Sequence, residues 1–210
     1  FKYEIPYMLL ITAVLLVMGM TGNEITFIEG VILWILFIAY LLYLYILAKK
    51  GNDSGDEQSV KLYPVWKCLL FIVLGGVCVV IGSQLVVNGA TTIARACGMS
   101  ERFIGLTIVA FGTSLPELVT SVSAARKGNA GIAIGNIVGS NIFNILFVIG
   151  TVALICPVPF ESRFVIDTVV AILCGVLLWG GTIRHKELRK PCGVVMLLCY
   201  AAYFVYLAAM

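Results

Sequence analysis

Two short runs, GTSLPE at residues 112–117 and GSNIFN at residues 139–144, place polar side chains inside an otherwise apolar stretch from Gly105 to Leu154. One of these side chains is the carboxylate of Glu117. A carboxylate at bilayer depth costs about 2.5–3.5 kcal/mol on insertion scales, so such groups usually have a function. The two runs therefore indicate where the chemistry of this protein lies.

The rest of the chain has the composition of a membrane protein. Of its 210 residues, 61% are hydrophobic and only 12% are charged, whereas soluble domains carry about 25% charged residues. A spanning helix needs roughly 20 residues, and the ten-residue alternating segments of a membrane barrel are absent. The sequence therefore predicts an all-α, polytopic membrane helical bundle. The seven expected spans are Ile5–Met20, Gly30–Ala48, Cys68–Val87, Ile104–Ala125, Gly131–Leu154, Phe164–Thr182 and Cys192–Ala209.

The basic residues predict how these spans are oriented. Of the 14 Lys and Arg, eleven fall on one side of the seven spans, and only Arg95, Arg102 and Arg163 fall on the other. Because Lys and Arg accumulate on the cytoplasmic side, the first side is expected to face the cytoplasm. This places the polar loop 49–67 in the cytoplasm and the C-terminus outside. We expect a multi-pass protein of the plasma (inner) membrane.

An internal repeat divides the chain. With a shift of 163 positions, residues 30–33 align with 193–196, and residues 39–44 with 202–207, matching one Gly and two Tyr. Repeats of five helices each would be inverted in the membrane. The predicted divisions are 1–48 as the last two helices of a first half, 49–67 as a linker, and 68–210 as a complete second half with its signature at 105–154. The same register predicts about 100 residues before Phe1 that match Pro64–Arg163.

The helix that carries Glu117 is expected to break. Pro116 cannot donate a hydrogen bond to the carbonyl of Gly112, and its ring disturbs a regular helical turn. Backbone carbonyls between Ala110 and Gly112 would then be free to coordinate a cation. Thr113 and Glu117 are four residues apart, so on a continuous helix they would share a face.

The next helix adds further oxygen atoms. Gly131, Gly135 and Gly139 form a stripe that is expected to let helices approach closely. Ser140 and Asn144 continue one face, and Asn141 lies beside them. Polar residues of this kind often only join helices by hydrogen bonds. Glu117 favours a site instead, because no basic residue lies inside any predicted span and a cation or a proton must supply the balancing charge. Na⁺ and Ca²⁺ prefer such mixtures of oxygen ligands.

The two motifs resemble those of a known family. GTSLPE at 112–117, followed by GNIVGSNIFNI at 135–145, is similar to an α-repeat of the calcium/cation antiporter superfamily, and most similar to that of the prokaryotic sodium/calcium exchangers. That family has ten helices in two inverted halves, each with one α-repeat. The chain resembles helices four to ten, with the second α-repeat.

The resemblance implies a role for each candidate residue. Glu117 would be the main Ca²⁺ carboxylate, Thr113 and Ser140 would supply hydroxyl ligands, and the carbonyl of Ala110 would contact Na⁺. Asn144 occupies a position that is Asp or Asn across the family. Ser114 and Asn141 complete the candidate set. The resemblance implies Na⁺ and Ca²⁺ as transported ions and no organic cofactor. The other expected partners are the lipid bilayer and the missing first half of the same protein, with no nucleic acid.

The implied function is exchange of Na⁺ for Ca²⁺ by alternating access, in which the two ions compete for one site that opens to either side. Three other functions were weighed. A cation/proton (Ca²⁺/H⁺) antiporter is the nearest, since Glu117 can also carry a proton. A non-transporting membrane subunit is the second. An intramembrane enzyme is disfavoured because HExxH, paired intramembrane Asp, and Ser with an intramembrane base are all absent. We therefore expect a transporter and not an enzyme.

Overall fold

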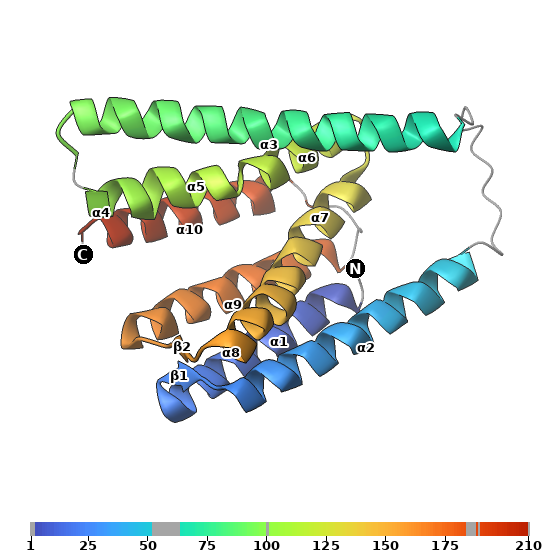
Figure 1. Cartoon of the computed structure of the whole chain (residues 1–210), viewed down its shortest axis with the longest axis horizontal. Coiled ribbons are helices and arrows are strands. Elements are labelled where there is room, and N and C mark those ends of the chain that lie inside the picture. Colours follow the sequence, from blue (N-terminus) through green and yellow to red (C-terminus); the bar gives the residue numbers. More distant parts are fainter. Residues whose placement is uncertain (1–2, 52–63, 100, 184–187, 189, 210) are drawn as a thin grey trace. The chain divides into compact units, whose positions relative to one another are not determined.

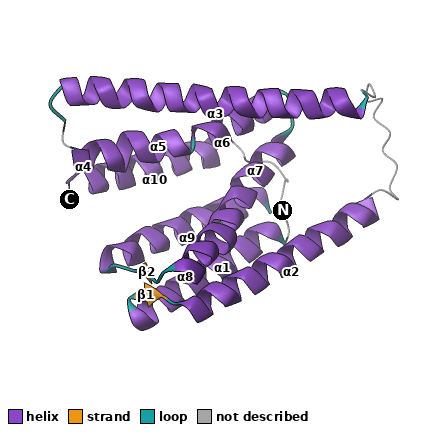
Figure 2. Cartoon of the chain, in the orientation of Figure 1, coloured by secondary structure: helices purple, strands orange, loops and turns teal. Residues whose placement is uncertain are grey.

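A computed structural model describes residues 3–51, 64–99, 101–183, 188 and 190–209, and these form mostly helix (Figures 1 and 2). In chain order the elements are α1 (Glu4–Gly22), β1 (Glu24–Ile25), α2 (Phe27–Gly51), α3 (Val65–Ala96), α4 (Glu101–Ile104), η1 (Gly105–Val109), α5 (Ala110–Thr113), α6 (Leu115–Arg126), α7 (Ala130–Phe143), η2 (Asn144–Ile149), α8 (Gly150–Ile155), β2 (Val158–Pro159), α9 (Ser162–Thr182) and α10 (Lys190–Ala209). The elements η1 and η2 are short π-helices.

The predicted helical bundle is confirmed, and each of the seven expected spans falls on helix. Among the described residues, five helices are long and apolar enough to cross a membrane, and the bent pair 107–113 and 115–126 adds a sixth span if it crosses as one. The seventh expected span corresponds to α10, whose apolar part over Lys190–Tyr206 is shorter than the other five. The third helix is longer than the predicted span. It was predicted to end at Val87, but α3 continues to Ala96, because a helix does not stop where its apolar run stops.

The chain divides into two compact units. The first unit comprises residues 1–55 and 130–200, and the second comprises residues 56–129 and 201–210. These units do not follow the predicted division at 1–48, 49–67 and 68–210. That division concerns repeats in the sequence and not compactness, so it stays a prediction. Most of the predicted linker, residues 52–63, lies outside the described residues.

The first unit contains the main hydrophobic core. In it α2 packs against η2 and α8, and α1 packs against α7 and α9 (Figure 1). Fully buried side chains from each of these groups meet in one cluster, including Ile5, Ile11, Leu33, Ile142 and Leu146. In a water-soluble protein, burying one such side chain would contribute about 1.5–3 kcal/mol to folding stability. In a membrane the gain comes instead from close packing of helices.

Two glycines set the crossing of α2 and α8. A Cβ atom on Gly30 would lie 2.9 Å from the Cβ of Ala153 and 3.0 Å from the carbonyl oxygen of Gly150. A Cβ atom on Gly150 would in turn lie 3.2 Å from the Cβ of Leu33. The backbones of the two helices therefore touch at this point, and neither glycine has room for a side chain.

Replacing Gly30 by Ala is expected to destabilise the protein, because the new methyl group meets backbone that cannot move aside. Overpacking of this kind typically costs about 1–3 kcal/mol. The matched control is Gly193→Ala, 163 positions later in the predicted repeat, where a Cβ atom meets only Leu188 Cδ2 at 3.9 Å. Both changes raise helix propensity equally, so the difference in thermal unfolding in detergent reports the crossing alone. Equal melting temperatures for the two variants would contradict the prediction.

A short β-ladder, which was not predicted, joins two loops of the first unit. Glu24 pairs with Pro159 and Ile25 with Val158 in antiparallel register. The N–H of Phe160 extends the ladder by donating to the carbonyl of Asn23 at 2.7 Å. The ladder fastens the α1–α2 loop to the α8–α9 loop.

The second unit is built on α3, which contacts α4, η1, α5 and α6. A glycine with positive φ follows the last residue of each of α3 and α6 by two positions: Gly98 at 75° and Gly128 at 77°. This conformation suits glycine just after a helix C-terminus. In the last turn of α3, Arg95 donates two hydrogen bonds to Glu101, at 2.6 and 2.9 Å. Donation from Arg95 lowers the pKa of the Glu101 carboxylate. This exposed pair closes the α3–α4 turn.

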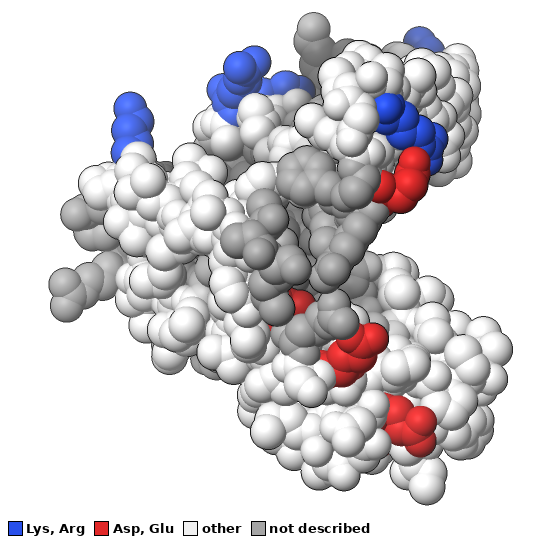
Figure 3. All heavy atoms as spheres, turned by 90° about the vertical axis from the view of Figure 1, so that its left-hand side faces the viewer, with Lys and Arg blue, Asp and Glu red and all other residues white. Residues whose placement is uncertain are grey.

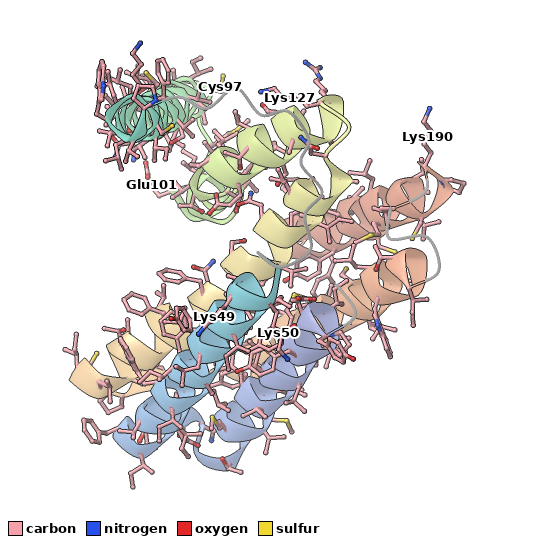
Figure 4. The ribbon with its side chains drawn as sticks, turned by 90° about the vertical axis from the view of Figure 1, so that its right-hand side faces the viewer. Lys49, Lys50, Cys97, Glu101, Lys127 and Lys190 are labelled. Carbon is pink, nitrogen blue, oxygen red and sulfur yellow. The ribbon has the colours of Figure 1, made fainter. Side chains whose placement is uncertain are left out.

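Apolar side chains cover much of the surface, as expected in a membrane. The most apolar part of α3 has no buried residue within the described structure. Its residues Val65, Ile72 and Leu85 are 75%, 69% and 67% exposed. Figure 3 shows that Lys, Arg, Asp and Glu occupy little of the described surface on the face it draws. Lys49 and Lys50 lie at the end of α2, and Lys190 at the start of α10 (Figure 4). These charged groups therefore lie at helix ends, where they can reach water.

Two features of the described structure agree with the register of the predicted repeat. The described part of α10 starts at Lys190, 163 positions after Phe27, the first residue of α2. The rings of Tyr40 and Tyr43 stack with centroids 6.3 Å apart, and those of the matching residues 203 and 206 do the same at 6.3 Å. Tyrosines three apart on any helix lie close together, so the repeat stays a prediction.

Candidate functional site

The helix that carries Glu117 is broken at Ser114. α5 ends at Thr113, α6 begins at Leu115, and the two segments meet at a bend of 52°. The N–H of Ser114 donates to the carbonyl of Phe111 at 3.1 Å, three residues back instead of the four of an α-helix. The predicted break is confirmed, and it falls beside the carbonyls from Ala110 to Gly112.

The break creates a new helix N-terminus, and Glu117 lies in its first turn. Pro116 fits there because the first helical N–H groups need no partner within the helix. The positive end of the helix dipole stabilises a carboxylate in this position by about 0.3–1 kcal/mol. The Glu117 side chain is half-buried, and its Oε2 atom is buried. The hydroxyl of Thr120 donates to the carbonyls of Pro116 and Glu117, both at 3.0 Å. The local fold therefore places the Glu117 carboxylate where the helix N-terminus favours a negative charge.

Thr113 and Glu117 do not share a continuous helix, contrary to the simple four-residue argument. Thr113 is the last residue of α5 and is exposed, whereas Glu117 belongs to α6. The helix bends by 52° at Ser114, between the two residues, so the regular four-residue spacing of one helix does not apply to this pair.

Gly112 lets α5 pack closely against α3. The residue is buried, and a Cβ atom on it would overlap Val87 Cγ2 of α3. Glycine is therefore needed at this position by close packing as well as by the break. The sequence suggested only its flexibility.

The second polar run lies on α7 and η2. The hydroxyl of Ser140 donates to the carbonyl of Ile137 at 3.1 Å, and Asn141 Nδ2 donates to the same carbonyl at 2.9 Å. Asn144 is exposed and is the first residue of η2. A π-helix within an α-helix is frequently found at functional sites. Here both helices that carry candidate ligands contain one, and η1 ends immediately before Ala110. The sequence analysis predicted neither π-helix.

The glycine stripe of α7 borders an open space at Gly139. A Cβ atom on Gly139 would meet nothing within 4 Å. Gly135 and Gly139 line a cavity of about 520 Å³ together with Glu4 of α1 and side chains of α2. At Gly139 the expected close approach to another helix is therefore not found among the described residues. Spacing predicts that glycines share a face, but it does not predict what faces them.

Glu4, which the sequence analysis did not single out, contributes a carboxylate to that cavity. Its Oε1 accepts a hydrogen bond from the hydroxyl of Tyr43 at 3.2 Å, and the ring of Tyr40 also lines the cavity. An acidic residue at the start of an apolar segment was the available signal. It was overlooked because acidic residues commonly begin helices.

The candidate ligands divide between the two compact units. Ala110, Thr113, Ser114 and Glu117 belong to the second unit, and Ser140, Asn141 and Asn144 belong to the first. Each unit brings its own set together on one broken or π-bulged helix. Their union in a single site remains a prediction. Among the described residues, no group of three or more His, Cys, Asp or Glu side chains could hold a metal ion. The oxygen atoms on offer are one carboxylate with hydroxyls, amides and carbonyls, which suit a hard cation such as Na⁺ or Ca²⁺.

Comparison with known proteins identifies the class. The sodium/calcium exchanger protein family matches residues 67–209. The chain is 38% identical to the sodium/calcium exchanger MaX1 of Methanosarcina acetivorans over 142 residues, covering 67% of this chain and 41% of that protein. It is 32% identical to the inner membrane protein YrbG of Escherichia coli, covering 93% and 63%.

A solved structure supports the same assignment. The sodium/calcium exchanger from Methanococcus jannaschii matches with a TM-score of 0.79 and 31% identity, over 98% of this chain and 64% of that chain. The chain therefore belongs to the sodium/calcium exchanger protein family, as the resemblance predicted. It is a multi-pass integral membrane protein of an ion-exchanger family and not of an enzyme family. It spans less than two thirds of the length of each of these relatives.

Proposed function

We propose that the protein exchanges Na⁺ for Ca²⁺ across a membrane by alternating access. The observation that carries this proposal is the position of Glu117 at a helix N-terminus created by the break at Ser114, in a chain of the exchanger family. Such a terminus stabilises the ionised carboxylate, and a bound cation then balances its charge. Transport follows because a site at a break can be reached from either side as the flanking helices shift.

The proposed site draws its oxygen ligands from the two polar runs. Glu117 supplies the main carboxylate for Ca²⁺, Thr113 and Ser140 supply hydroxyls, and the carbonyl of Ala110 contacts Na⁺. Asn144 contributes an amide oxygen, and Ser114 and Asn141 complete the set. A first repeat half of the same protein, preceding this chain, would provide a second carboxylate and complete the coordination. The ions are the substrates, and no organic cofactor takes part.

The basic residues support an orientation for the proposed transporter. The ends of α2 and α6 and the start of α10 carry Lys or Arg, so these ends face the cytoplasm and the C-terminus lies outside. The loop 49–67 is then cytoplasmic. The name of YrbG, an inner membrane protein, agrees with a location in the plasma (inner) membrane.

Flux measurements test the function directly. The complete protein is reconstituted in vesicles, and ⁴⁵Ca²⁺ uptake is followed under an imposed Na⁺ gradient and, separately, under an imposed pH gradient. We expect uptake that follows the Na⁺ gradient and is unaffected by a pH gradient alone. Uptake driven only by the pH gradient would replace this proposal with a Ca²⁺/H⁺ antiporter. Absence of uptake under both gradients would favour a non-transporting subunit.

Asn144→Asp is expected to make Ca²⁺ bind more tightly and to make transport sensitive to mild acid. The change adds a second carboxylate to the proposed site, and its negative charge attracts a divalent cation more strongly than a neutral amide does. Because a carboxylate must be deprotonated to bind Ca²⁺, protons compete with the ion, and transport should fall as the pH is lowered. The pH profile of Na⁺-driven Ca²⁺ uptake measures this.

The control is Asn129→Asp, which adds the same charge at an exposed position after α6. It should leave the pH profile of the wild-type protein unchanged. A matching acid shift in both variants would show that general surface charge, and not the site, is responsible.

A further inference from the structure

The π-helical segment η2 begins at Asn144, one turn after Ser140, so it starts at the last residue of the second polar run. A π-helix forms its hydrogen bonds to the residue five positions back instead of four, and such segments are rare and short. What holds η2 is therefore relevant to the proposed site. In the first unit, α2 provides that contact.

A chain of two hydrogen bonds links α2 to the end of η2. The indole Nε1–H of Trp34 donates to Thr151 Oγ1 at 3.2 Å. The hydroxyl of Thr151 donates in turn to the carbonyl of Phe147 at 2.5 Å. The same carbonyl accepts the backbone N–H of Gly150, the residue at which the π-helix ends. Thr151 can donate to Phe147 and accept from Trp34 at once because a hydroxyl has both capacities.

Aromatic packing fixes the rest of the segment. The rings of Phe143 and Phe147 stack with centroids 4.7 Å apart. Phe37 of α2 packs against both, at 5.9 and 5.4 Å, and Trp34 lies 5.1 Å from Phe147. Phe143 directly precedes Asn144, so the contact with α2 reaches the first residue of the π-helix.

We infer that Trp34 and Thr151 are positioning residues for cation binding: through the carbonyl of Phe147 they hold η2 in its π-helical form and so orient Ser140 and Asn144. The inference rests on the proposed function, because it names residues that act on the same site. Among the described hydrogen bonds, Trp34 and Thr151 make none with the candidate ligands of the same unit, Ser140, Asn141 and Asn144. Groups that orient metal ligands through hydrogen bonds typically affect affinity by 10–100-fold when they are polar partners of the ligand itself. Here the link is one step longer.

Three substitutions separate the hydrogen bonds from the packing. Thr151→Val keeps the shape and removes the hydroxyl, Trp34→Phe keeps an aromatic ring and removes the N–H, and Thr151→Ser keeps the hydroxyl. The matched control is Thr182→Val on α9, where a buried threonine, 3% exposed, donates only to the carbonyls of Leu178 and Trp179 in its own helix. All four are made in the complete protein and reconstituted in vesicles.

We expect Thr151→Val and Trp34→Phe each to raise the Ca²⁺ concentration for half-maximal Na⁺-driven uptake by about threefold to tenfold, as the loss of one hydrogen bond allows. The maximal rate should change less. Thr151→Ser and Thr182→Val should behave like the wild type. The double variant of Trp34 and Thr151 should resemble either single one, because the chain is already broken. A Thr151→Val protein that matches Thr182→Val, or single effects that add in the double variant, would overturn the inference.

A spectroscopic measurement gives a readout that does not depend on transport. Replacing every other tryptophan of the complete protein by Phe, Trp66 and Trp179 of this chain among them, leaves Trp34 as the one tryptophan that emits. Its emission should shift when Ca²⁺ is added, and Thr151→Val should abolish the shift. An emission spectrum that ignores Ca²⁺ in this protein would also overturn the inference. Uptake by the wild-type protein tests the proposed function separately, so the two failures are distinguishable.

Discussion

Glu117→Gln should abolish Na⁺-driven Ca²⁺ uptake, with a loss of at least about 100-fold. The substitution keeps the size and shape of the side chain but removes the negative charge and replaces one acceptor oxygen by an NH2 donor. A divalent ion taken from water into a membrane protein depends on carboxylate charge far more than on neutral oxygens. Since Glu117 lies in the first turn of α6, the amide also forfeits its interaction with the helix dipole. Uptake of ⁴⁵Ca²⁺ into vesicles measures the loss.

The control for this experiment is Glu101→Gln, which removes a carboxylate from the same unit. Glu101 is exposed and pairs with Arg95 at the end of α3. Exposed ion pairs contribute little, so uptake by this variant should stay close to that of the wild type. Normal uptake by the Glu117→Gln protein would refute the proposed site.

Gly112→Ala should reduce transport at least tenfold while leaving Glu117 in place. The added methyl group would overlap Val87 Cγ2, and valine has little rotational freedom with which to avoid it. Because Gly112 lies just before the break, the shift displaces the carbonyls and side chains of the proposed site. A misplacement of about 1 Å is enough to disturb a preorganised site. Uptake kinetics at saturating Na⁺ measure the effect.

A second substitution can reverse this loss. Val87→Ala removes the two methyl groups that the new Cβ atom would meet, so the double variant should regain most of the uptake lost by Gly112→Ala. Gly105→Ala, where a Cβ atom would meet nothing within 4 Å, controls for the general effect of alanine in this span. A double variant as impaired as the single one would show that the overlap with Val87 is not the cause.

Local rules predicted the features that depend on local chemistry. The break near Pro116 follows from a missing N–H and a bulky ring, which act within one turn, so the structure confirms it. The helix bundle follows from composition and hydropathy for the same reason. The family was also recognisable, because the runs at 112–117 and 135–145 carry a specific pattern of polar residues.

Features that depend on distant contacts were not predictable. The crossing of Gly30 with Gly150 joins residues 120 positions apart, and nothing near either glycine indicates it. Gly30 and Gly193 align in the predicted repeat, yet of these two glycines only Gly30 has a close neighbour helix among the described residues. The link from Trp34 to Thr151 was invisible for the same reason. Helix-to-helix contacts of this kind require three-dimensional information.

The small β-ladder has a consequence for how the protein is made. β1 and β2 pair residues that are more than 130 positions apart, and a ribosome adds about 5–20 residues per second. The hairpin of α1 and α2 therefore waits on the order of ten seconds in the membrane before its loop finds a partner. During that interval the contact with Phe160 that closes over Gly19 cannot form. A chaperone that binds unpaired loops, or a protease that cleaves them, would act at this stage of synthesis.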